Sequence, residues 1–456
     1  MTLLAPPPIP RAAGSLPFLG HAVQLVRDNL GFVASLRSRY GPLVEITLQP
    51  GTRTVIVQDP DLIRSMLTDL GPSLDKGRFF EKMGQLLGES VVTAVGQEHV
   101  RRRRQLQPAF ARPEIARYVD TMRTETETAV DTWTPGRRLD VREAMVKLSL
   151  DMLAKTVFSG SLDEATFRRL RDDLSVVMNG VGARVMLPDW AERIPLPLNR
   201  RFDAARDAVR ATIDQAVAEL QNSGLDSGDM LSLLLHATDE ETGLPLTGQQ
   251  IGSEVLTLAV AGTETTASVL SWALYEITRD RGIEEAVLEE LDTVLADRPV
   301  TFDDLPRLPY LERVVRETLR LHHTGWLVTR RTVTPTRIGD RTVPAGTELA
   351  YCQHALHRDP RLFPEPFAFT PDRWLDETQA GAFTPGAFLP FGAGRHKCIG
   401  DRFALTELMT ALATIVRRTR FEIRPHQRVR PVARATVRPS TLLMSTHPRG
   451  RGGDRG

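Results

Sequence analysis

Cys398 lies in a loop whose residues favour a thiolate. The loop reads Phe391-Gly-Ala-Gly-Arg-His-Lys-Cys-Ile-Gly400 and directly precedes an amphipathic segment expected to be a helix. Its glycines at 392, 394 and 400 allow positive φ and close backbone approach, so amide donors and a helix N-terminus can surround the sulfur. The basic residues 395–397 also favour the thiolate. Such a group could be a nucleophile, a redox sensor or a metal ligand, whereas a cysteine without this setting is usually a small buried hydrophobic group.

Polar residues interrupt the most apolar helical segment of the chain. Ala261-Gly-Thr-Glu-Thr-Thr266 lies inside the segment 255–269. Buried polar groups are costly unless they are used, and Gly262 lowers helix propensity by about 1 kcal/mol relative to alanine. The segment could be a kink with satisfied hydroxyls, or Glu264 and Thr265 could form a carboxyl and hydroxyl pair that handles protons.

Three further patterns of charge or histidine are ambiguous by themselves. Glu317 and Arg320 are three residues apart on a predicted helix, a spacing that often gives only a weak surface ion pair. The four arginines at 101–104 follow His99, and such runs are usually solvated faces or nucleic-acid patches. The adjacent His322 and His323 could suggest a metal site, but neighbouring side chains rarely converge on one ion.

Composition indicates a folded protein of one large domain or several smaller ones. The chain has 456 residues, 41% of them hydrophobic, which is long and apolar enough for a sizeable core. With 58 Lys and Arg against 57 Asp and Glu, the net charge of +1 excludes a global attraction to nucleic acid or anionic lipid. Two cysteines cannot form a disulfide framework, and we see no apolar run of membrane length, so we expect a soluble cytoplasmic protein without a membrane anchor.

The periodicity predicts a mainly α protein with a minor β part. A proline-rich arm (1–20) precedes a hairpin of 43–46 and 54–57 around Pro50-Gly51. About ten helices follow from residue 60 to 320, including a long one that begins with a capping box, Thr247 to Gln250. Strands are expected at 326–333, 337–343 and 348–351, then a loop (359–394), a final helix (399–417) and a disordered tail (446–456).

The motifs, taken in order along the chain, resemble the cytochrome P450 family. The loop around Cys398 is similar to the family's haem-thiolate loop, and Ala261 to Thr266 is similar to its oxygen-binding segment. Glu317 and Arg320, with Arg373 in the later Phe369-Thr-Pro-Asp-Arg-Trp374, resemble its Glu-Arg-Arg triad. The resemblance covers roughly residues 10–444. It implies one P450 domain over 1–456, with a long central helix over the haem and small sheets near the N-terminus and in the C-terminal half.

The resemblance also implies roles for individual residues. Cys398 would be the iron ligand of haem b, Glu264 would gate protons from solvent, and Thr265 would assist oxygen activation. The triad would brace the haem loop, and Cys352 would be dispensable. The remaining haem-binding positions are His99, Arg103, Arg330, Phe391, His396 and Gly400. The family often has two prolines where this chain has His323 and Thr324, which leaves the conformation of that segment open.

The implied activity is a monooxygenase that inserts one oxygen atom of O2 into an apolar molecule. Electrons would come from a ferredoxin and its NAD(P)H-dependent reductase, and the enzyme is expected to be a monomer. The substrate pocket would include Phe79, Phe80, Leu87, Val177, Val260, Ala261, Trp326, Leu327 and Leu442. The basic face for the ferredoxin would include Arg101, Arg102, Arg104, Lys397 and Arg402, with Arg395 beside the cysteine.

A terpenoid is the favoured substrate, since Asp75 to Glu81, Gln107 to Phe110 and the ending at Asp401 look similar to actinobacterial terpene-oxidising members. A macrolide or polyketide and a fatty acid are the alternatives. Two other classes stay open: a P450 that isomerises or cyclises without net oxygenation, against which Glu264 and Thr265 argue, and a haem sensor or carrier.

Overall fold

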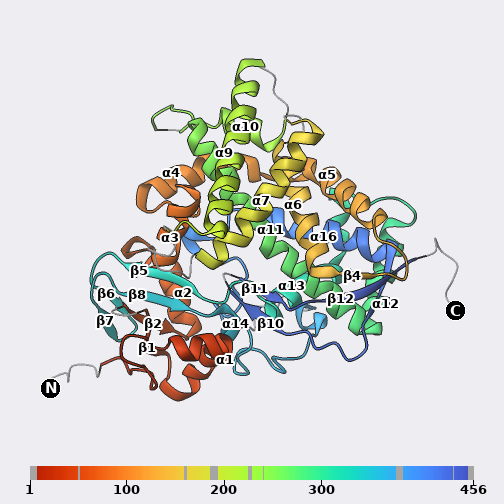
Figure 1. Ribbon diagram of the computed structural model, residues 1–456. Helices are drawn as coiled ribbons and strands as arrows, with labels where there is room; N and C mark the ends of the chain where they lie inside the picture. Colours follow the sequence, from red (N-terminus) through yellow and green to blue (C-terminus); the bar gives the residue numbers. More distant parts are fainter. Residues whose placement is uncertain are drawn as a thin grey trace. The chain divides into compact units, whose positions relative to one another are not determined.

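The computed structural model describes residues 8–49, 52–158, 162–184, 194–223, 228–239, 241–375, 384–434 and 436–449. Figure 1 labels the helices and strands along the chain. Internal contacts divide the chain into two compact units. Unit 1 comprises residues 1–82 and 319–398, and unit 2 comprises residues 83–318 and 399–456. Each unit is therefore built from segments distant in the sequence. The expectation of one domain over the whole chain stays a prediction.

Unit 1 contains a five-stranded sheet in the order β1-β2-β8-β5-β3. The strands β1 and β2 form the predicted antiparallel hairpin, whose Pro50-Gly51 turn lies outside the described residues, and β2 runs parallel to β8. Helix α1 lies against β1 and α14. The strands are β1 (Leu43–Gln49), β2 (Thr52–Val57), β3 (Leu74–Lys76), β5 (Val328–Thr332), β6 (Thr336–Ile338), β7 (Arg341–Val343) and β8 (Glu348–Tyr351). The helices are α1 (Ala22–Tyr40), α2 (Pro60–Leu67) and α14 (Gln353–Leu356).

Unit 2 is mainly helical, and α11 is its longest helix. Thr247 caps α11 with the predicted capping box, in which Thr247 and Gln250 bond to each other's backbone amides. Neighbours of α11 include α6, α7, α9 and α16. The helices are α4 (Gly96–Leu106), α5 (Arg112–Asp131), α6 (Val141–Phe158), α7 (Glu164–Arg184), α9 (Pro197–Ser223), α10 (Met230–His236), α11 (Gly248–Arg279), α12 (Arg281–Leu295) and α16 (Asp401–Arg418). Two more, α3 (Arg78–Leu87) and α13 (Pro309–Leu321), begin in one unit and end in the other.

Strands at the end of the chain were missed or misjudged from the sequence. Unit 2 contains the sheet β4-β12-β9 and the pair β10-β11. The expected tail from residue 446 is wrong in part, because residues 446–448 belong to β12 and pair with β9. In unit 1, the predicted single strand 337–343 is instead the hairpin β6-β7, which turns at Gly339 with φ of 59°. The strands of unit 2 are β4 (Arg138–Asp140), β9 (Thr419–Ile423), β10 (Pro431–Ala433), β11 (Val437–Pro439) and β12 (Leu443–Pro448).

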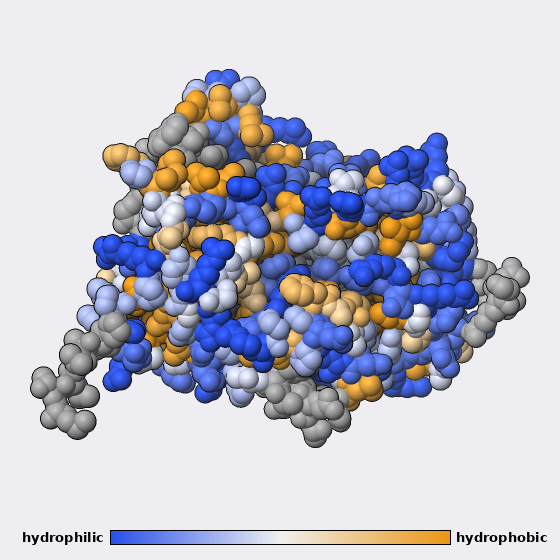
Figure 2. All heavy atoms as spheres, turned by 90° about the horizontal axis from the view of Figure 1, so that it is seen from below, coloured by the Kyte–Doolittle hydropathy of each residue, from blue (hydrophilic) through white to orange (hydrophobic). Residues whose placement is uncertain are grey.

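Within the described ranges, every helix is too short or too polar to cross a lipid bilayer. Figure 2 shows hydrophilic side chains over much of the face seen from below, with apolar ones scattered among them.

Candidate active site

The Cys398 loop is held against α2 inside unit 1. Gly394 has φ of 67°, and a Cβ at this position would lie 1.9 Å from the Leu67 carbonyl oxygen, so only glycine fits. Gly392 also has positive φ, at 68°. The Cys398 amide donates to the Phe391 carbonyl at 2.9 Å, which closes the loop on itself. Gly400, the N-cap residue of α16, has φ of −92° and does not use the freedom of a glycine to take positive φ.

The two cysteines lie in opposite environments. Cys398 is exposed at the end of its loop, just before α16 begins. Cys352 is buried at the N-cap of α14, and burial raises the pKa of its thiol to about 11. A thiol that stays neutral is a poor metal ligand. Of the two, only Cys398 has a setting suited to binding iron.

Two arginines of unit 1 offer positive charge beside this loop. Arg330 on β5 is 6% exposed, and burial, together with Arg395, lowers its pKa, while Tyr351 and Asp75 act in the opposite direction. The buried Nε of Arg395 has no hydrogen-bond acceptor among the described residues. Buried guanidinium groups require acceptors, and carboxylates are their best partners. The pair therefore suits a ligand that carries carboxylates, as haem does through its propionates. His396 lies in the same loop and is half-buried.

The polar segment of α11 creates an accessible stripe on an otherwise buried helix. Leu258, Ala261, Gly262 and Thr265 are partly exposed, at the spacing of one helix face. Thr265 Oγ1 donates to the Ala261 carbonyl at 2.7 Å and lies 3.3 Å from the Gly262 carbonyl. The stripe lacks bulky polar side chains, so it suits contact with a flat apolar ligand. Taken by itself, this face fits the apolar plane of a haem, as the arginines of unit 1 by themselves fit its carboxylates.

Glu264 lies beside the stripe and is within electrostatic reach of Arg438 on β11. Burial and Arg142 lower the pKa of Arg438, and Glu264 raises it. The Ser268 hydroxyl donates to the Val437 carbonyl at 3.0 Å and holds β11 on α11. Sequence reasoning missed Arg438, since its strand was not predicted.

The predicted propionate residues on α4 are four positions apart on one helix face. His99 is buried, and Arg103 is half-buried. The following segment, Gln107–Phe110, packs onto α16, where Phe110 and Phe403 make an edge-to-face contact at 6.3 Å. This contact joins the segment Gln107–Phe110 to α16, the helix that begins after Cys398.

One predicted member of the basic face is wrong. Arg102 is 1% exposed, and its side chain points to the buried Glu254 of α11. Sequence alone did not reveal which arginine of the run turns inward. The side chains of Arg101 and Arg104 are 38% and 41% exposed, and they pair with Glu98 and Glu241, respectively. Lys397 and Arg402 are exposed.

The arginines of the predicted triad bind the loop that precedes the Cys398 loop. Arg320 donates to the carbonyls of His357, Pro366 and Ala368 at 2.8–2.9 Å. Arg373 donates to the carbonyls of Pro364 and Glu365. Glu317 is fully buried on α13. The predicted bridge from Glu317 to both arginines stays a prediction, whereas the hydrogen bonds from both arginines to the loop carbonyls are observed.

The predicted pocket residues divide between the units. Phe79, Phe80, Trp326 and Leu327 belong to unit 1, whereas Leu87, Val177, Val260, Ala261 and Leu442 belong to unit 2. Phe79 and Phe80 contact each other edge to face at 5.3 Å. Leu87, Val177 and Leu442 are fully buried, whereas Val260 and Ala261 are partly accessible.

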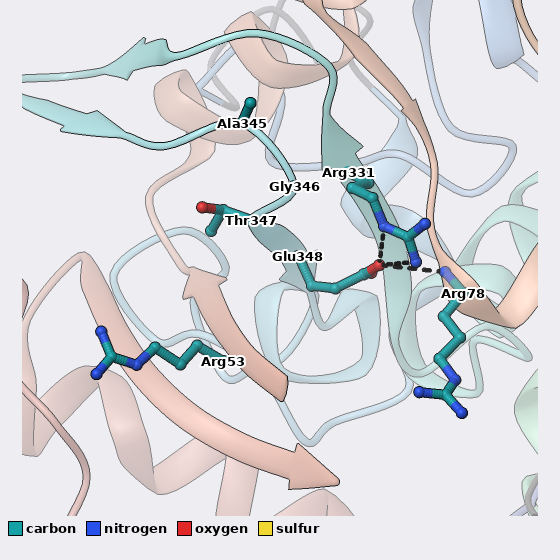
Figure 3. Close-up of a pocket in the computed structure, with 7 residues that line it drawn as sticks. All are labelled: Arg53, Arg78, Arg331, Ala345, Gly346, Thr347 and Glu348. Carbon is teal, nitrogen blue, oxygen red and sulfur yellow. Dashed lines mark hydrogen bonds and ion pairs between the residues drawn. The ribbon is translucent and has the colours of Figure 1, made fainter. Parts of the chain in front are cut away.

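A surface pocket of about 360 Å³ in unit 1 is separate from these residues (Figure 3). It is lined by Arg53, Arg78, Arg331, Ala345, Gly346, Thr347 and Glu348. Glu348 Oε1 accepts from Arg331 Nε at 2.6 Å and from the Arg78 amide at 3.3 Å. These bonds hold the start of α3 and hence Phe79 and Phe80. In the part of the chain that the structure describes, no cluster of three or more His, Cys, Asp or Glu is arranged to hold a metal ion.

Comparison with known proteins agrees with this geometry. The model of the family described as Cytochrome P450 matches residues 7–448. The chain is 43% identical to cyclooctat-9-en-7-ol 5-monooxygenase of Streptomyces melanosporofaciens, over 92% of both chains. It is 34% identical to pentalenene oxygenase of Streptomyces avermitilis, over 93% of this chain and 94% of the relative.

A solved structure, the cytochrome P450DA heme domain, superimposes with a TM-score of 0.87 at 26% identity and 98% coverage of both chains. Membership of the family implies a haem bound through a thiolate. The chain belongs to the cytochrome P450 family and is a monooxygenase of that family.

Proposed function

We propose that this monooxygenase oxidises a terpenoid, with haem b as its cofactor. The observation that carries the proposal is the 43% identity to cyclooctat-9-en-7-ol 5-monooxygenase over nearly the whole chain. The 34% identity to pentalenene oxygenase supports the same substrate class. The predicted pocket residues, which are aliphatic or aromatic, favour an apolar substrate over a sugar or a charged acid.

We assign Cys398 as the iron ligand, because it is exposed in a glycine-rich basic loop ahead of α16, whereas Cys352 is a buried neutral thiol. Arg330, Arg103, His99 and His396 would bind the haem carboxylates. The bound haem supplies the chemistry that puts one atom of O2 into a C–H bond and releases the other as water. The protein orients the substrate and delivers protons.

Glu264 and Thr265 would deliver protons along the accessible face of α11. Thr265 is half-buried, and its hydroxyl is held by the Ala261 carbonyl. Glu264 is partly exposed and lies within electrostatic reach of Arg438, so we assign it the relay of protons from solvent. Retention of both groups favours oxygenation over isomerisation or cyclisation.

Electrons would come from a ferredoxin and its NAD(P)H-dependent reductase in the cytoplasm. Ferredoxins are acidic, and the exposed Arg104, Lys397 and Arg402 offer complementary charge. Arg102 is excluded from this role by its burial.

Substrate-induced spectral shifts test the proposal. Purified holoenzyme is titrated with matched panels of cyclic terpenes, macrolides and fatty acids, and the haem Soret band is followed. Terpenes should give saturable type I shifts, and the best of them should yield an oxygenated product with a ferredoxin, its reductase and NAD(P)H. Shifts confined to macrolides or fatty acids would overturn the substrate class. Saturable binding without product or NAD(P)H consumption would favour a carrier, and a rearranged product without oxygen would favour an isomerase.

A further inference from the structure

Three buried side chains hold the backbone at the entrance to the Cys398 loop. His357 Nε2 accepts the Leu389 amide proton at 3.2 Å. His323 Nε2 lies 3.0 Å from the Pro390 carbonyl oxygen. Gln353 Nε2 donates to the Leu389 carbonyl. Leu389 and Pro390 directly precede Phe391, whose carbonyl accepts the Cys398 amide, so these bonds set the path of the chain into the loop.

His323 occupies a position where proline is frequent in the family, and its surroundings are adapted to the imidazole. His323 Nδ1 lies 2.9 Å from both the amide nitrogen and the carbonyl oxygen of Gly325, so it accepts from the amide when it is bare and donates to the carbonyl when it carries a proton. A Cβ at Gly325 would lie 2.7 Å from Gln353 Oε1 and 3.2 Å from His323 Cε1, so a larger residue would disturb both groups. Hydrogen bonds to the loop thus replace the rigidity that a proline ring would supply.

The bond from Leu389 to His357 requires a neutral imidazole. Because Nε2 accepts this bond, the ring proton must be on Nδ1. A second proton would place a donor at Nε2 against the Leu389 N–H, and the bond would be lost. His323 would be affected too, since the rings lie 5.1 Å apart, edge to face.

The surroundings of both rings favour the neutral form. His323 and His357 are 3% and 0% exposed, and burial is the main cause that lowers the pKa of each. Nearby positive or titratable groups add to this effect, whereas the hydrogen bonds of His323 to Pro390 and Gly325 raise its pKa in opposition. The acidic Asp359 bonds instead to Arg361. The groups around the pair are Arg320, Arg358, His322, His354, Phe363 and Phe388.

We propose that His323 and His357 are positioning residues that hold Pro390 and Leu389, and through them Cys398, and that the bond to Leu389 persists only while the His357 imidazole is neutral. This inference rests on the proposed role of Cys398 as the iron ligand. Acid should therefore release the loop and detach the thiolate before the protein unfolds.

The test follows the thiolate-specific ferrous–CO band of the holoenzyme between pH 8 and pH 5, with far-UV circular dichroism in parallel. The variant His357→Gln keeps an acceptor for the Leu389 amide but cannot ionise, and His323→Gln keeps a donor for Pro390. His357→Gln should move the acid midpoint of band loss to lower pH, by about half a unit or more, whereas His323→Gln should keep the wild-type midpoint. His357→Ala and His323→Ala should each lower the ratio of intact to lost thiolate band about fivefold at pH 7.5 and equal haem content, since a neutral hydrogen bond contributes roughly 1 kcal/mol. His236→Gln, at an exposed histidine, is the matched control.

An acid midpoint unchanged in His357→Gln would overturn the proposal, and so would alanine variants with an unchanged band ratio. If His357→Gln fails to fold, the band ratio of His357→Ala at equal haem content still decides. A wild-type enzyme without the thiolate band at any pH would instead overturn the assignment of Cys398, so the two failures are distinguishable.

Discussion

Arg102 Nη1 lies 3.6 Å from Glu254 Oε1, and both side chains are buried. Glu254 also accepts the Val91 amide through both carboxylate oxygens at 3.0 Å, and Arg102 Nε donates to Glu98 at 2.6 Å. The pair thus ties α4 and the segment before it to α11, the helix that carries Glu264 and Thr265. An arginine in a basic run is here part of the interior.

Removing one partner of this pair should destabilise the enzyme strongly. Arg102→Met leaves Glu254 charged and buried, at a cost of about 3 to 5 kcal/mol in the free energy of unfolding. Urea denaturation measures the change. The double variant Arg102→Met/Glu254→Gln should recover most of the loss, because the amide still accepts from Val91. The exposed Arg101→Met is the control, and an equal loss there would disprove the special role of Arg102.

Glu407 on α16 should reduce stability as pH rises. Burial raises the pKa of its carboxyl to about 8, against an opposing hydrogen bond from Thr266. Between about pH 4.5 and 8 the unfolded chain releases this proton while the folded chain keeps it, so stability falls by about 1.4 kcal/mol per pH unit. Glu407→Gln should remove this slope, and its thermal midpoint should exceed that of the wild type most at pH 8. The exposed Glu285→Gln should follow the wild type at every pH.

The two cysteines should behave oppositely on substitution. Cys398→Ser should abolish the thiolate-type ferrous–CO band, while some haem is retained. Cys352→Ala should keep both the band and the haem content, because the Cys352 thiol is buried and neutral and is not part of the Cys398 loop. Ferrous–CO difference spectra of the two variants at matched protein concentration measure the band in each. A normal band in Cys398→Ser would refute the ligand assignment.

Thr265→Ala should uncouple electron use from product formation. The variant loses the hydroxyl that the Ala261 carbonyl holds on the accessible face of α11, so proton delivery should fail while substrate still binds. We expect product per NAD(P)H to fall several-fold, the peroxide yield to rise and the type I shift to persist. Thr265→Ser, which keeps the hydroxyl, is the matched control and should stay coupled. Equal coupling in Thr265→Ala and wild type would remove this residue from proton delivery.

Reversal of exposed arginines should weaken reduction by an acidic ferredoxin. Arg104→Glu and Arg402→Glu should each raise the apparent KM for ferredoxin, with little change in substrate-binding spectra. The wild-type rate should fall with salt as the Debye length decreases toward about 10 Å at 0.1 M. Arg420→Glu, a reversal of an exposed arginine on β9, is the control. Stopped-flow reduction rates that change neither with salt nor with these reversals would contradict the proposed docking face.

Local signals in the sequence determined the elements and motifs of this protein. The capping box at Thr247 to Gln250 and the hairpin of β1 and β2 depend on neighbours within a few residues, so spacing alone predicts them. The family could be predicted for the same reason, because its motifs are short and ordered along the chain.

Long-range packing decided the rest. Whether Arg102 is a surface charge or a buried partner depends on Glu254, which is 152 positions away and belongs to another helix. The strand β12 exists through its pairing with β4 and β9, and His323 acquired a role through Pro390 and Gly325. A side chain's burial and hydrogen-bond partners come from segments that only the folded chain brings together, so its local sequence cannot specify them.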